Sequence, residues 1–236
     1  MYAVAPPVIV MISAPLTVAA SLEPTAQHLR RLGCSVILPD VLSSTRNLPR
    51  WRDWPDILLA EFPSSRAVTL IGHSSATLLV AQLASSMPEA NLILLDGDIP
   101  PAAGAVTPIS SRLAEIVARL PDEAGVLPPW STWWSEPLDR HIGIDQLSQG
   151  DRQALAMAEP RFLRTWFSDH LDLAEWMDRP TAYIQTSIFY DEALQEAQSH
   201  GWPTIRIEGT HLHPMLRPVE TAEAIATILS IQQEGG

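Results

Sequence analysis

The sequence predicts an α/β fold, with a mostly parallel sheet flanked by helices. Short runs of β-branched residues and leucine alternate along the chain with segments of helical periodicity, as in a doubly wound sheet. A chain of 236 residues, 46% of them hydrophobic, is also long enough to bury one sizeable core. The alternation is interrupted over residues 100–180, which indicates an insertion.

The expected strands are short and read as buried parallel strands, at residues 8–12, 35–38, 67–71, 91–95, 181–186 and 204–207. Helical patterns fall between or after them, at residues 23–32, 53–60, 77–86, 190–200 and 219–232. The segment 67–95 reads as strand, helix and strand, and this βαβ unit requires the two strands to be parallel.

Residues 1–99 and 181–236 are therefore predicted to form the core, and residues 100–180 a helical lid. An insertion after a strand end lies at the carboxyl edge of the sheet, where open α/β folds bind ligands. The lid carries five of the eight tryptophans, and one or two of them are expected to face a substrate. The candidates are Trp130, Trp133, Trp134 and Trp166, with the alternative that the aromatic residues only pack a small core of the insertion itself.

Composition excludes several functions. The net charge is −12 and all 15 basic residues are arginine, so Schiff-base chemistry is excluded and binding to nucleic acid or an anionic membrane is not expected. The single cysteine, Cys34, allows no internal disulfide and no CxxC metal site. The apolar run at residues 8–11 is too short to span a membrane and reads as a strand. We expect a cytoplasmic protein without a metal or cofactor.

Ser74 is the candidate nucleophile. It lies in Gly-His-Ser-Ser-Ala, between the strand at 67–71 and the helix at 77–86. A tight strand-to-helix turn that exposes a serine needs small residues two positions to either side, and Gly72 and Ala76 fill those places. A serine hydroxyl also needs a base to take its proton and an acid to orient that base.

His211 is the expected base, because it follows Gly-Thr in the loop after the last strand. His213 is the alternative, constrained by the proline that follows it. Asp96 is the expected acid, since it ends the strand that follows the helix after Ser74. Asp98 and Asp191 are the alternatives, although either aspartate of Asp-Gly-Asp could simply shape a turn.

An oxyanion hole needs two backbone N–H groups aimed at the developing negative charge. One is expected from Ser75, the residue after the nucleophile. The other is expected from Leu16, with Thr17 as the alternative, because Pro15 in the loop after the first strand has no N–H.

Together, the first strand and its loop, Leu-Pro-Asp at 38–40, Gly-His-Ser-Ser-Ala and the Gly-Thr-His loop resemble the α/β-hydrolase superfamily over essentially the whole chain. In this chain the expected acid ends the strand that follows the helix after Ser74. This placement resembles that in the thioesterase domains of polyketide and nonribosomal-peptide assembly lines, which also carry a helical lid. Most α/β-hydrolases place this acid one loop later. The chain departs from the usual motif at Ala76 and at the extra His213 and Pro214.

The resemblance implies release of an acyl group from an ester or thioester through an acyl-serine. The apolar lid indicates a neutral or hydrophobic small-molecule substrate. A non-hydrolytic cyclase, isomerase or binding protein is one alternative. A carrier-protein editing thioesterase, docked through Arg46, Arg50 and Arg52, is another. The sequence leaves the acyl group, the acceptor and the oligomeric state open.

Overall fold

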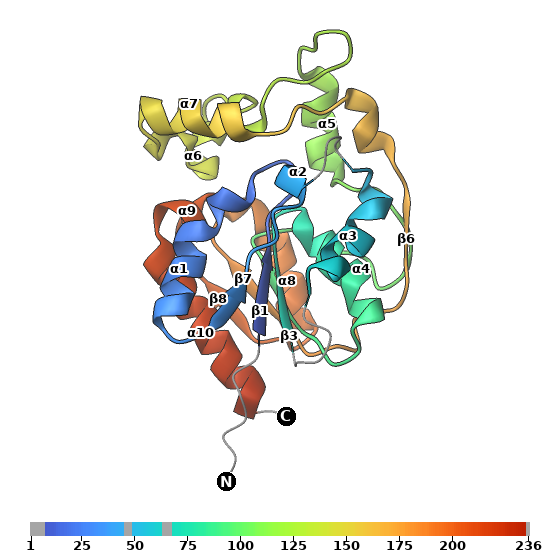
Figure 1. Cartoon of the computed structure of the whole chain (residues 1–236), viewed down its shortest axis with the longest axis vertical. Helices are drawn as coiled ribbons and strands as arrows, with labels where there is room; N and C mark the ends of the chain where they lie inside the picture. The colour runs from blue at the N-terminus through green and yellow to red at the C-terminus, as the bar shows by residue number, and fades with distance from the viewer. Residues whose placement is uncertain (1–7, 45–48, 63–67, 235–236) are drawn as a thin grey trace.

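A computed structural model describes residues 8–44, 49–62 and 68–234. Its centre is a six-stranded sheet in which every pair of neighbouring strands is parallel, in the order β2-β1-β3-β4-β7-β8 (Figure 1). The strands are β1 Val8–Ile12, β2 Ser35–Ile37, β3 Val68–His73, β4 Asn91–Leu95, β7 Thr181–Gln185 and β8 Thr204–Arg206. The predicted fold class is confirmed.

Helices cover both faces of this sheet. The long helices α1, Glu23–Arg31, and α10, Pro218–Glu234, pack together over one face and share a buried apolar cluster with it. The helices α3, Trp54–Ala60, α4, Ala76–Ser86, and α8, Asp191–Ser199, contribute to the larger cluster on the other face. The four central strands are almost wholly buried, as expected for runs of Val, Ile and Leu covered on both sides.

Strand register places the chemistry at one edge of the sheet. His73 pairs with Leu95 across β3 and β4, so the next residues, Ser74 and Asp96, lie side by side where these strands end. The backbone continues the ladder there, because Ser74 N–H donates to Leu95 O at 3.0 Å and Asp96 N–H donates to Ile184 O at 2.8 Å.

We call residues 100–180 the insertion; most of it lies beyond this edge, while its last part, from β6 onward, runs back along the side of the core to the start of β7 (Figure 1). The insertion contains α5 Ser111–Arg119, α6 Leu138–Ile142 and α7 Gln149–Ala158, with the 3₁₀ helices η3 Trp130–Thr132, η4 Ile144–Gln146 and η5 Arg164–Ser168. It also contains two strands that the sequence did not predict, β5 Gly104–Val106 and β6 Leu171–Leu173, paired antiparallel. The insertion is thus mostly helical, as expected, but it also carries this short strand pair.

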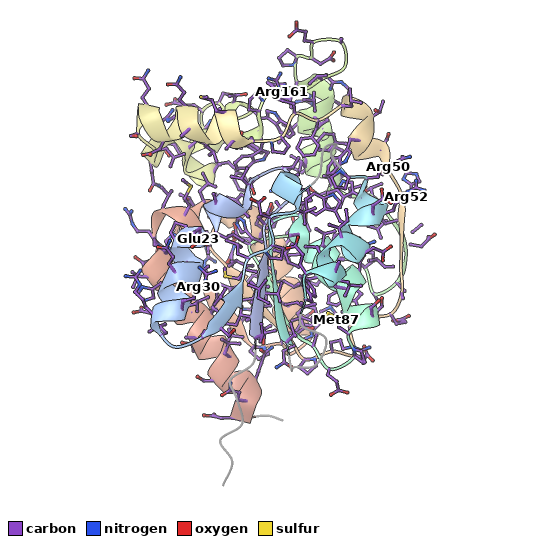
Figure 2. The ribbon with its side chains drawn as sticks, viewed as in Figure 1. Glu23, Arg30, Arg50, Arg52, Met87 and Arg161 are labelled. Carbon is purple, nitrogen blue, oxygen red and sulfur yellow. The ribbon has the colours of Figure 1, made fainter. Side chains whose placement is uncertain are left out.

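The insertion is fastened to the core near its C-terminal end. Trp166 Nε1 donates to Pro49 O at 3.0 Å, and the Trp166 and Trp51 rings lie 4.9 Å apart. Arg50 forms an ion pair with Asp169 beside them. Figure 2 shows Arg50 and Arg52 at this junction.

The remaining elements are short. They are α2 Val41–Ser44, α9 His213–Leu216, η1 Ala19–Ser21, η2 Trp51–Asp53 and η6 Ile188–Tyr190. The sequence analysis missed α2 and α9 because one helical turn leaves too few residues for a period to show. Ala67, expected at the start of a strand, lies outside the described residues. Within the described ranges, no helix combines the length and the apolar character that crossing a membrane requires.

Candidate active site

Ser74 lies in a strained turn between β3 and α4. Its φ is 60°, in the left-handed region that non-glycine residues rarely adopt. The surrounding backbone is packed closely enough to exclude side chains, because a Cβ on Gly72 would lie 2.5 Å from Ala76 O and one on Gly97 would lie 2.2 Å from Ser74 O. This geometry is that of a nucleophile elbow, and it explains the small residue at position 72.

Asp96 lies at the end of β4, also at a positive φ of 46°, and its side chain is fully buried. One carboxylate oxygen, Oδ1, accepts the backbone N–H groups of Thr186 and Ser187, both at 2.7 Å. The other, Oδ2, accepts the Ser187 hydroxyl at 2.8 Å and lies 2.7 Å from His211 Nδ1. This carboxylate is therefore held rigidly against the imidazole.

His211 lies in the loop after β8, and its backbone is tied to the insertion, since its N–H donates to His141 O at 2.9 Å. With Nδ1 facing Asp96, Nε2 is the nitrogen left to accept a proton. Ser74 and His211 both border the same cavity. The structure thus brings together the three residues that the sequence nominated as nucleophile, base and acid.

His73 packs against His211. The sequence analysis did not single out this residue. Its ring stacks on the His211 ring at 4.7 Å, and its Nε2 lies 3.0 Å from His211 O. Burial and the neighbouring His211 lower the pKa of His73 to about 3, so it is neutral at physiological pH and its Nε2–H donates to that carbonyl. Its position directly before the nucleophile was the available sequence signal.

The expected oxyanion donors border the cavity as well. Leu16 and Ser75 both line it near Ser74. The N–H of Thr17 is already used, because it donates to Ala14 O at 2.9 Å, which favours Leu16 over Thr17. Ser75 directly precedes α4, so its N–H belongs to a helix N-terminus that favours negative charge.

The alternative residues have other partners. His213 begins α9, where its Nε2 lies 3.2 Å from Glu220 Oε2, and burial lowers its pKa. Asp191 accepts from Gln185 and lies 3.6 Å from Arg206. Asp98 borders the cavity, where partial desolvation raises its pKa, but its carboxylate makes no hydrogen bond to His211 within the described part of the chain.

The cavity above Ser74 has a volume of about 810 Å³. Trp130 and Trp134 line it, and the Trp130 ring lies 6.2 Å from the His211 ring. Trp133 and Trp166 are not among the cavity-lining residues. Trp133 donates to Pro128 O and packs on Phe167, and Trp166 packs on Trp51. The expectation that these two face a substrate is therefore corrected: they form the core of the insertion and fasten it.

His73, Asp96 and His211 offer atoms within 4.8 Å of one another, a spacing that could suit a metal ion. Asp96, however, already accepts hydrogen bonds on both oxygens, and His211 Nδ1 faces one of them. Asp96 and His211 Nδ1 are thus already engaged with each other and with the segment after β7, which suits a Ser-His-Asp arrangement better than a metal centre.

The arginines expected to dock a carrier protein do not form one free patch. Arg46 lies outside the described residues. Arg50 pairs with Asp169 of the insertion, and Arg52 is exposed beside it (Figure 2). Arg50 therefore has a structural partner, and docking of a carrier protein remains a prediction.

Comparisons with known proteins agree with this geometry. A model of the alpha/beta hydrolase family matches residues 12–224, whereas no curated protein matches significantly. The structure is similar to an extracellular alpha/beta-hydrolase from a Paenibacillus species, with a TM-score of 0.67 and 17% identity over 94% of this chain and 99% of that one. It is also similar to tomato methylketone synthase I complexed with 2-tridecanone, with a TM-score of 0.66 and 18% identity over 97% and 98% of the two chains. A pyrethroid hydrolase from Sphingobium faniae gives a TM-score of 0.65 and 18% identity over 97% and 99%. The chain therefore belongs to the alpha/beta hydrolase family and is a hydrolase of that family.

Proposed function

We propose that the protein cleaves an ester or thioester of a hydrophobic acyl group through an acyl-serine intermediate. The observation that carries this proposal is the contact of 2.7 Å between the buried Asp96 Oδ2 and Nδ1 of His211, a residue that borders the same cavity as Ser74. The strained turn at Ser74 supports it, because backbone strain of this kind concentrates at functional sites.

In the proposed reaction, His211 Nε2 takes the Ser74 proton as Oγ bonds to the acyl carbon. Asp96 stabilises the imidazolium that forms, and the N–H groups of Ser75 and Leu16 stabilise the oxyanion. Cleavage of the bond to the leaving group follows, with the proton of His211 going to the departing atom. Water then attacks the acyl carbon as His211 Nε2 takes its proton, and that proton returns to Ser74 Oγ when the bond between the acyl carbon and Oγ breaks. Every catalytic group in these steps belongs to the chain.

The substrate class is argued from the cavity. Its volume of about 810 Å³ is in the range of sites for drug-sized ligands, and aromatic side chains of the insertion border its reactive end. We propose that residues 100–180 act as a lid over the core formed by residues 1–99 and 181–236. The similar tomato structure holds 2-tridecanone, a long apolar ketone, which supports an apolar substrate here.

The test is the replacement of Ser74 by alanine. Hydrolysis of p-nitrophenyl esters and acyl thioesters should fall to near background, and a fluorophosphonate probe should label the wild type stoichiometrically but not the variant. Ser85→Ala is the matched control, because Ser85 is an exposed serine on the same helix. Undiminished turnover by Ser74→Ala would refute the proposal.

A further inference from the structure

Tyr190 is a polar residue at the reactive end of the cavity that the proposed mechanism does not use. It ends η6, in the segment after β7 that holds Asp96 through Thr186 and Ser187. Its ring lies 5.7 Å from the His211 ring, on the side of the cavity where Ser74 also lies. Both Tyr190 and Ser74 border the cavity.

The direction of a hydrogen bond between Tyr190 and Ser74 follows from counting protons. A serine hydroxyl has one proton, and in the proposed mechanism His211 accepts it, so towards a neighbouring phenol Ser74 Oγ can act only as an acceptor. Burial raises the pKa of Tyr190, and the nearby Asp98 and Asp96 raise it further, so the phenol keeps its proton throughout the working pH range. Tyr190 is thus a permanent donor in the cavity that holds the reacting serine.

Such a hydrogen bond must change during the reaction. When Ser74 Oγ bonds to the acyl carbon it becomes an ester oxygen, which is a weaker acceptor than a hydroxyl. The phenol then needs another acceptor in a partly buried site, because an unsatisfied buried donor is costly. The carbonyl oxygen is assigned to the N–H groups of Ser75 and Leu16, so the acceptor left for the phenol is the leaving atom, which is bonded to the same carbon as Oγ and gains negative charge as that bond breaks.

We propose that Tyr190 is a catalytic residue that donates a hydrogen bond to the departing alcohol oxygen, and that the site therefore selects oxygen esters of aliphatic alcohols over thioesters. This inference rests on the proposed function. The bond between acyl carbon and alcohol oxygen breaks, its electron pair goes to that oxygen, and His211 supplies the proton. Tyr190 retains its own proton throughout.

The preference for oxygen esters follows from the chemistry of the leaving atom. An aliphatic alkoxide concentrates its charge on a small oxygen that accepts hydrogen bonds strongly. Sulfur is a weak acceptor, and a nitrophenolate spreads its charge over the ring, so both benefit less from the donor. Removal of the phenol hydroxyl should therefore cost most for the poorest oxygen leaving groups.

The experiment compares wild type with Tyr190→Phe on substrates that share one acyl group and differ in the leaving group: p-nitrophenol, trifluoroethanol, ethanol and ethanethiol. We expect kcat/KM to fall about 100-fold for the ethyl ester and less than about tenfold for the p-nitrophenyl ester and the thioester. Tyr183→Phe is the matched control. It removes a buried hydroxyl that donates to Gly97 O at 2.7 Å, outside the cavity lining, and should leave the dependence on leaving group unchanged.

Each outcome decides the inference. A loss that grows from the p-nitrophenyl to the ethyl ester supports it. An equal loss on all four substrates would mean that Tyr190 only positions Ser74, and no loss would mean that it has no role; either result overturns it. Wild-type turnover that does not depend on Ser74 refutes the proposed function itself, and comparison with Ser74→Ala reveals that separately.

Discussion

Asp96→Asn tests the link between acid and base most directly, because the four contacts of Asp96 divide between its two oxygens. Oδ1 accepts from the N–H groups of Thr186 and Ser187, while Oδ2 faces Ser187 Oγ and His211 Nδ1. Asparagine keeps the shape but has one acceptor oxygen. The two N–H groups orient that oxygen, so the amide NH₂ faces His211.

The substitution should therefore reverse the tautomer of His211. An NH₂ donor against Nδ1 makes Nδ1 an acceptor and places the imidazole proton on Nε2, where it prevents acceptance of the Ser74 proton. The equivalent substitution in a Ser-His-Asp protease lowers kcat about 10⁴-fold. A loss of this size corresponds to about 5 kcal/mol of transition-state stabilisation.

The assay is kcat/KM on a p-nitrophenyl ester, with thermal unfolding measured to show that each variant is folded. Asp98→Asn and Asp191→Asn are matched controls, since each removes one nearby acid that makes no hydrogen bond to His211 within the described residues. If folded Asp96→Asn retained activity within about tenfold of the wild type, the assignment would be wrong. A large loss in Asp98→Asn instead would transfer the role to that residue.

Two further predictions concern packing and pH. Gly97→Ala should destabilise the protein by about 1 to 3 kcal/mol and lower kcat/KM, because the new Cβ would lie 2.2 Å from Ser74 O. Gly150→Ala is the control and should change neither quantity, because the nearest atom to its Cβ lies at 3.8 Å. Equal melting temperatures for the two variants would contradict the prediction. Burial raises the pKa of Glu159 from 4.5 to about 7, so the folded state binds this proton more tightly than the unfolded chain. Stability should then fall by about 3 kcal/mol as pH rises between these values. Glu159→Gln should flatten that slope in urea unfolding, and an unchanged slope would disprove the role of Glu159.

The sequence revealed the parts of the site that depend on strand ends. Ser74 and Asp96 each follow an apolar strand directly, and parallel neighbours end at the same edge, so their proximity could be predicted. The short antiparallel pair β5 and β6 could not, because three-residue strands separated by more than sixty residues leave no local period. Trp133 and Trp166 were misassigned for a related reason: composition marks an aromatic insertion, but only packing decides which rings face inward.

Tyr190 escaped notice because its position depends on a turn rather than on a period. This turn follows β7, which is the parallel neighbour of β4, the strand that ends at the acid. Leu95 pairs with Ile184 across these strands, so Asp96 and the segment after Gln185 emerge together. With the acid on β4, that segment supplies no carboxylate to the imidazole. It supplies the N–H groups of Thr186 and Ser187 that hold the acid instead.

The position of the acid at the end of β4, and not in the segment after β7, therefore has a chemical consequence. The segment after β7 still reaches the site, where it presents Tyr190 to the cavity that Ser74 borders. A carboxylate at that place could only accept hydrogen bonds, whereas a phenol donates them. The segment after β7 thus holds the acid through Thr186 and Ser187 and also brings a hydrogen-bond donor, Tyr190, to the cavity. On this reasoning, placing the acid on β4 is what makes room for a second donor, and loss of selectivity for alkyl esters should accompany loss of the Tyr190 hydroxyl while the contact between Asp96 and His211 stays intact.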